Sequence, residues 1–125
     1  MKELSEAEWN VMESLWESFP KVGSQIVADM VNRTGWSRST TLTMLRRMTD
    51  KGLIFCEDNG KMKTYTPLIE RETAVKKETE SFLNRVYHGS ISMLVCGLVQ
   101  RQRLSQDEIA ELRQILDEAE EGKYD

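Results

Sequence analysis

The chain has 125 residues, a length that suits one small domain or a domain with an appendage and that excludes a large enzyme. It carries 17 Lys and Arg against 21 Asp and Glu, and this net charge of −4 taken alone argues against a nucleic-acid partner. No apolar run reaches the roughly 18 residues of a membrane span, and the acidic start differs from a signal peptide, so we expect a cytoplasmic protein without membrane insertion.

The first predicted helix covers residues 6–18. Ser5 followed by Glu8 is a capping-box pattern that marks its start, and Pro20 stops it. Between them the apolar residues recur at helical spacing: Trp9, Met12, Leu15, Trp16 and Phe19. These side chains are expected in the core, with the tryptophans as anchors.

A second helix is predicted over residues 25–33, entered by the link Lys21-Val22-Gly23, capped by Ser24 and ended by Gly35. Its expected buried stripe is Ile26, Val27, Met30 and Val31. Because a further helix follows after a tight glycine-containing turn, the pair is a helix-turn-helix candidate.

The third helix is predicted to start after the N-cap Ser37 and to close at Gly52. Its expected core face is Thr41, Met44, Leu45 and Met48. The remaining surface supplies the predicted DNA contacts: Arg38, Ser39, Thr40, Leu42, Thr43, Arg46 and Arg47. Arginine binds guanine edges or phosphate, hydroxyls reach either, and apolar groups fit the thymine methyl.

A β-hairpin is predicted next, with strands over 53–57 and 62–66. The Asn59-Gly60 pair between them favours the positive φ angles of a tight turn. Lys61 and Lys63 on this wing are placed for backbone phosphate. Residues 33–65 hold seven basic and three acidic side chains, a local charge of +4 that predicts double-stranded DNA as the partner.

The remaining residues, 70–125, are predicted to form a long helix over 70–88, an apolar helix over 91–99 and a last helix behind the capping box of Ser105 and Glu108. A unit of 56 residues buries too little surface alone, so we expect a homodimer, which also suits paired half-sites in DNA. The expected dimer contacts are Phe82, Val86, Leu94, Val95, Leu98, Ile109, Leu112 and Leu116.

The predicted fold is therefore mainly α with a small β-hairpin: a winged helix-turn-helix DNA-binding domain over residues 1–69, then a helical dimerisation domain over 70–125. Cys56 and Cys96 lack any metal or redox spacing and are expected as small buried side chains, and His88 is expected to end a helix at the surface. Motifs of catalysis are missing, so we expect no enzyme, cofactor or metal.

Five segments of the chain carry a family resemblance: Leu4–Met12; Trp36-Ser37 with Thr40, Thr43, Leu45, Arg47, Lys51 and Gly52; Tyr65–Leu68; Phe82–Tyr87 with Gly89; and Leu104–Leu112. Together they resemble the penicillinase-repressor family, the BlaI/MecI/CopY group of winged-helix repressors. The resemblance implies a homodimer on an inverted-repeat operator that blocks transcription of beta-lactam resistance genes. It assigns DNA contacts to Ser39, Thr40, Thr43 and Arg47.

The resemblance also implies release by a membrane sensor-protease that cuts the dimerisation domain. The penicillinase branch is cut at an Asn-Phe pair, and the candidate cleavage site at the matching position here is Gly97-Leu98. Leu42 replaces a basic residue of some members, which predicts a different operator sequence. The C-terminal CxCxxxxCxC motif of the copper-responsive branch is missing, so metal sensing by that route is not expected.

Two other readings of the same residues stay open. In the first, a small molecule bound in the apolar C-terminal half releases the repressor, and the chain would then stay intact on release. In the second, the fold is kept as a protein-interaction module, and an operator-shift assay separates it from a DNA-binding protein.

Overall fold

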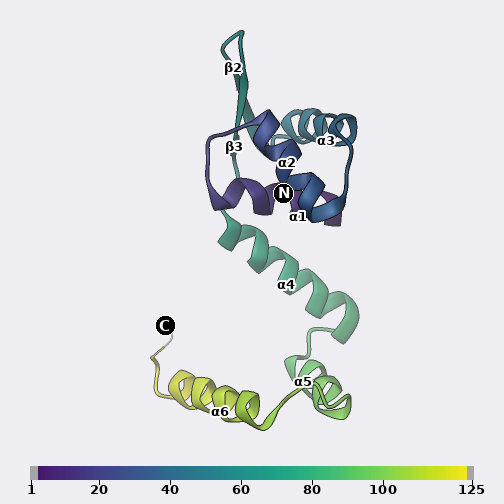
Figure 1. Cartoon of the computed structure of the whole chain (residues 1–125). Coiled ribbons are helices and arrows are strands. Elements are labelled where there is room, and N and C mark those ends of the chain that lie inside the picture. The colour runs from purple at the N-terminus through teal and green to yellow at the C-terminus, as the bar shows by residue number, and fades with distance from the viewer. Residues whose placement is uncertain (1–2, 124–125) are drawn as a thin grey trace. The chain divides into compact units, whose positions relative to one another are not determined.

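The computed structural model describes residues 3–123 as six helices and a three-stranded antiparallel sheet (Figure 1). The elements are α1 (Glu6–Glu17), β1 (Lys21–Val22), α2 (Gly23–Thr34), α3 (Arg38–Asp50), β2 (Ile54–Asp58), β3 (Lys63–Pro67), α4 (Arg71–Tyr87), α5 (Ile91–Gln100) and α6 (Gln106–Glu120). The predicted mainly α fold with a β-hairpin is confirmed.

Contacts divide the chain into two compact units, which we call the head, through Thr79, and the tail, from Glu80. The division falls inside α4, whereas the sequence placed a domain boundary between residues 69 and 70. The start of α4 stays with the head because Ala74 is buried there and Arg71 Nε donates to Glu13 Oε1 at 2.8 Å. The outer limits of the predicted domains, residues 1 and 125, lie outside the described residues.

The predicted capping box opens α1: Glu8 N–H donates to Ser5 Oγ at 3.2 Å and Ser5 N–H to Glu8 Oε1 at 2.8 Å. Helical spacing then buries Val11, Met12 and Leu15 completely. The expectation that Phe19 continues this stripe is wrong, since 55% of Phe19 is exposed. The helix ends at Glu17 and the next residue is extended, so helical spacing no longer sets the direction of the side chain.

The segment expected as a link before α2 is the strand β1, in which Lys21 pairs with Tyr65 and Val22 with Thr64. This pairing makes Val22 the N-cap and starts α2 at Gly23, so the prediction of Ser24 as the cap is wrong. Ile26 and Met30 are fully buried, as predicted. Val31 is not: it is 53% exposed, because it projects about 100° around the helix from Met30.

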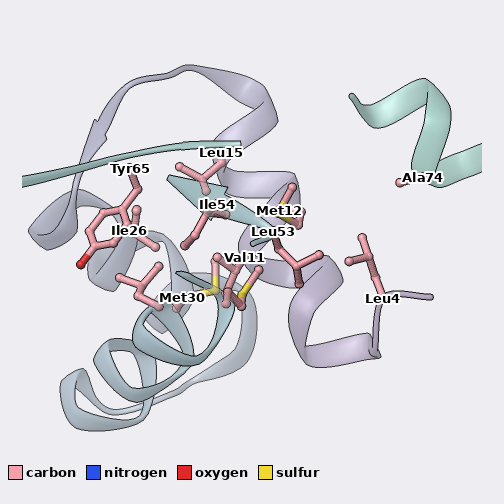
Figure 2. Packing of buried hydrophobic residues seen from close by; sticks show 12 residues of the cluster. Leu4, Val11, Met12, Leu15, Ile26, Met30, Leu53, Ile54, Tyr65 and Ala74 are labelled. Atoms are coloured by element: carbon pink, nitrogen blue, oxygen red, sulfur yellow. The ribbon is translucent and has the colours of Figure 1, made fainter. Parts of the chain in front are cut away.

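The core of the head lies where α1, α2 and α3 meet the sheet (Figure 2). Ser37 caps α3 as predicted, and Thr41, Leu45 and Met48 are fully buried. The tryptophans lie at the edge of this core, partly buried: Trp9, Trp16 and Trp36. Because three successive turns of α3 are fixed to the core, its opposite face must point outward.

The wing is the hairpin of β2 and β3, which extends beyond the helices of the head (Figure 1). The pairing runs from Ile54 with Pro67 to Asp58 with Lys63, so both strands lie one residue later than predicted. The turn is centred on Gly60 and Lys61, with Gly60 at φ +89°, whereas the sequence centred it on Asn59 and Gly60. Asn59 instead follows the last paired residue, Asp58, and its N–H donates to Met62 O across the turn at 3.3 Å.

The tail comprises the second half of α4 with α5 and α6, and none of its described side chains is buried. The predicted Ser105–Glu108 capping box opens α6, and His88, exposed with φ +53°, ends α4 as expected. Cys56 is half-buried, whereas Cys96 is exposed, so the expected burial of Cys96 is wrong; α5 itself has no buried residue. Among residues 3–123 no helix is long and apolar enough to cross a membrane.

Candidate nucleic-acid interface

The outward face of α3 forms a ridge between two hollows. On the wing side lies a hollow of about 590 Å³, whose lining includes Leu42, Arg46 and Lys63. On the other side, a shallower hollow of about 190 Å³ includes Thr40 and Arg47 in its lining. Ser39 and Thr43 line both hollows, so they form the crest of the ridge. A ridge of small hydroxyl side chains flanked by arginines suits a DNA groove.

Hydroxyl groups surround the exposed first turn of α3. Ser37 Oγ accepts from Thr40 N–H at 3.2 Å, donates to Thr40 Oγ1 at 3.0 Å and lies 3.2 Å from Ser39 Oγ. Since Ser37 has one hydroxyl proton, which goes to Thr40, the Thr40 hydroxyl keeps its own proton to donate outward. The positive end of the helix dipole lies at this same turn. The turn can therefore donate to phosphate or base acceptors.

The wing brings two predicted residues close to the start of α3. Arg38, Lys61 and Lys63 line one hollow of about 320 Å³, together with Leu42 and the first residues of α2. Three cations around one hollow create a field that attracts a phosphate group. Arg47 lies apart from them, on the side of α3 away from the wing. The structure thus collects the predicted contacts around α3, and all except the half-buried Thr43 are exposed.

The nine basic residues from Lys21 to Arg71 fall into two classes; Lys76 and Lys77, further along α4, form no ion pair within residues 3–123. Between Lys21 and Arg71, four of them pair with carboxylates: Lys21 with Asp29, Arg33 with Glu17, Lys51 with Glu8, and Arg71 with Glu13. The other five form no ion pair within residues 3–123: Arg38, Arg46, Arg47, Lys61 and Lys63. These five are the cations predicted to contact DNA. The local charge of +4 for residues 33–65 also includes Arg33 and Lys51, but both pair with carboxylates of α1, Glu17 and Glu8.

Burial alone would raise the pKa of Glu8, but hydrogen bonds from Lys51 and Ser5 outweigh it and hold the pKa below its ordinary value. The carboxylate of Glu8 is therefore charged at neutral pH and holds Lys51 in an ion pair. Burial raises the pKa of Tyr65 to about 12, assisted by Cys56 and Asp58. Tyr65, in the lining of the hollow on the wing side of α3, therefore stays a neutral hydroxyl near the cations of α3 and the wing.

A buried polar network that was not predicted from the sequence lies between α1 and α2. Lys21 Nζ donates to Ser14 O at 2.6 Å and to Asp29 Oδ2 at 2.9 Å, and Ser14 Oγ donates to the same Asp29 oxygen at 2.6 Å. Burial would raise the pKa of Asp29, but hydrogen bonds from Ser14, Lys21 and Gln25 together lower it. The network joins α1, β1 and α2. Nothing in the local pattern around Lys21 indicated a buried lysine.

The chain is similar to known repressors over most of its length. The family model described as penicillinase repressor matches residues 4–118. The methicillin resistance regulatory protein MecI of Staphylococcus aureus is 36% identical over 114 residues, 91% of this chain and 93% of that protein. The penicillinase repressor of Bacillus licheniformis is 32% identical over 121 residues, 97% and 94% of the two chains. The solution structure of the DNA-binding domain of the repressor BlaI matches with a TM-score of 0.51 at 30% identity, covering 57% of this chain and 90% of that one.

Proposed function

This chain belongs to the penicillinase repressor family, and on that premise we propose that it is a homodimeric, cytoplasmic transcriptional repressor of beta-lactam resistance genes that binds an inverted-repeat operator. The observation that carries the DNA-binding role is the division of the basic residues. Within residues 3–123 the cations of α3 and the wing have no carboxylate partner, whereas the other four basic residues between Lys21 and Arg71 form ion pairs. Exposed, unpaired cations around a helix of suitable width fit the phosphates that flank a major groove.

The ridge of α3 would read bases. We expect Thr43→Ala and Arg47→Ala each to weaken operator binding by about 1–3 kcal/mol while the melting temperature hardly changes, because both side chains face away from the core. Operator titration and thermal unfolding measure the two effects separately. Arg33→Ala is the matched control, since its guanidinium pairs with Glu17 and it should bind DNA as the parent chain does. Equal losses of stability and affinity would place Thr43 or Arg47 in a structural role instead.

The wing would contact phosphates. Operator affinity should fall steeply with salt, and Lys61→Ala or Lys63→Ala should each reduce the slope of log affinity against log salt by about one unit without changing sequence preference. The control is Lys123→Ala, a tail lysine paired with Glu121, which should leave the slope unchanged. An affinity that does not depend on salt would contradict the phosphate assignment.

The tail would form the dimer. None of its described side chains is fully buried in the single chain, and the large apolar groups with exposures from 37% to 65% are Phe82, Val86, Ile91, Met93, Val95, Val99, Leu112, Ile115 and Leu116. Of the predicted dimer contacts, Leu94, Leu98 and Ile109 are half-buried and the other five are in this exposed set. Exposed apolar surface of this extent is typical of an interface, and a second copy would supply the missing core.

For release, we propose cleavage of the tail by a membrane sensor-protease, with Gly97-Leu98 as the candidate site. Both residues are half-buried within α5, and glycine inside a helix lowers the cost of local unwinding, which a protease needs. A denaturing gel of extracts from induced cells should show a shortened form of the chain. Gly97→Ala should slow the appearance of that shortened form. Release with the chain intact would point instead to a small-molecule signal.

A further inference from the structure

The turn of the wing is held by hydrogen bonds between its own side chains and backbone. Asp58 Oδ1 accepts from Gly60 N–H at 2.9 Å. Asn59 Oδ1 accepts from two further backbone groups, Lys61 N–H at 3.2 Å and Met62 N–H at 3.1 Å. All five residues, 58–62, are exposed to water.

Each of these contacts falls on a group that takes part in intramolecular deamidation. In that reaction the backbone nitrogen after an asparagine attacks its side-chain carbonyl carbon, and a following glycine hinders this attack least. The attack needs a base for the N–H proton and donors for the negative charge that develops on the side-chain oxygen. Here the Asp58 carboxylate accepts a hydrogen bond from the attacking N–H of Gly60. The backbone N–H groups of Lys61 and Met62 already donate to Asn59 Oδ1, the oxygen that becomes charged.

We propose that the wing turn is a self-modification site at which Asn59 converts to aspartate and isoaspartate. Asp58 takes the proton of Gly60 N–H, and the nitrogen forms a bond to Asn59 Cγ. The bond from Cγ to Nδ2 then breaks, and Nδ2 leaves as ammonia with the proton returned by Asp58. Water opens the resulting succinimide at either carbonyl, which gives aspartate or isoaspartate, and no oxidant or reductant is needed.

The product would change the charge of the DNA-facing wing. Glu57 and Asp58 balance Lys61 and Lys63 in the present sequence, so a carboxylate at position 59 gives the wing a net negative charge. Isoaspartate also adds a methylene group to the backbone of the turn. Both changes oppose phosphate contact by the neighbouring lysines. This consequence for operator binding, unlike the chemical step, rests on the proposed function.

The chemical step is tested by incubating the full chain at neutral pH and following each asparagine by peptide mapping and mass spectrometry. We expect Asn59 to deamidate faster in the folded chain than in the same chain unfolded in urea. Asp58→Asn keeps an acceptor for Gly60 N–H but removes the base, and it should slow the reaction at Asn59 by about 10²-fold, the lower end of what a positioned general base contributes. Asn10, Asn32 and Asn84 precede valine or arginine and serve as internal controls that stay unmodified. A folded chain that reacts no faster than the unfolded one, or an Asp58→Asn variant that reacts at the parent rate, would refute the proposal.

The consequence for binding is tested with Asn59→Asp, using Asn59→Gln as the neutral control. We expect Asn59→Asp to lower the salt slope of operator affinity by about one unit and Asn59→Gln to leave it unchanged. Parent-like binding by Asn59→Asp would refute the inhibitory effect of the modification. If the unmodified chain does not bind an operator at all, the proposed function fails, and the mass measurement still decides the chemical step.

Discussion

Ending the chain after Thr79 should reduce operator affinity by a factor of about 10² to 10⁴, because each head keeps its half-site contacts but loses the effective concentration of the second head. The cut leaves the head with its own core and with the contacts of Ala74 and Arg71, which hold the start of α4. Truncation at residue 70 would remove both, so Thr79 is the better end point. Sedimentation should show a folded monomer, and titration with a full and a half operator gives the loss of affinity.

A matched variant tests the same interface without shortening the chain. Leu116→Glu places a charge on a side chain that is 64% exposed in the single chain, so it should disrupt the dimer while the head stays folded. It should therefore bind the full operator as weakly as the truncated chain does. A truncated head that remains dimeric and binds as tightly as the intact chain would refute the proposed assembly and, with it, induction by cleavage.

Replacing Lys21 by methionine should lower the free energy of unfolding by about 3 kcal/mol, the cost typical of breaking a buried ion pair from one side. Lys21 is only 8% exposed and donates to both Ser14 and Asp29. Without it, the Asp29 carboxylate loses its cation and the Ser14 carbonyl loses a donor, and both stay largely covered. Denaturant unfolding of the two chains measures the difference.

The difference in free energy of unfolding between the parent chain and Lys21→Met should also depend on pH. The folded-state pKa of Asp29 is lowered, so its contribution to stability is present above the ordinary value of 3.8 and is lost as the pH falls through the folded-state pKa. The gap between the parent chain and Lys21→Met should therefore narrow in acid. The double variant Lys21→Met, Asp29→Leu should recover part of the loss, because it leaves no unpaired charge. Lys123→Met, which changes an exposed lysine, is the control. If Lys21→Met lowers the free energy of unfolding no more than Lys123→Met does, water replaces the contacts of Lys21 without cost.

Local features of the sequence predicted the helices of this protein well. The caps by Ser5, Ser37 and Ser105 join residues three apart, so a short window contains both partners. The spacing of Thr41, Leu45 and Met48 marked the core face of α3 and hence its outward face, because helical geometry relates residues three and four apart. The predicted DNA contacts around α3 followed from that face. Their contacts with DNA, like the dimer contacts of the tail, stay predictions.

Other features were decided only by the tertiary structure. Strand β1 exists because Lys21 and Val22 pair with β3, more than forty residues away, and this pairing moved the start of α2 from its expected cap. Glu8 and Lys51, 43 residues apart in sequence, form an ion pair that removes one charge from the predicted basic patch. Residue types and spacing carry no information about partners so distant. The sequence by itself therefore determined which segments are helical and which face of α3 is free, since both depend on contacts within one or two turns. Which cations remain unpaired on that face depends on long-range contacts, and only the folded chain decided it.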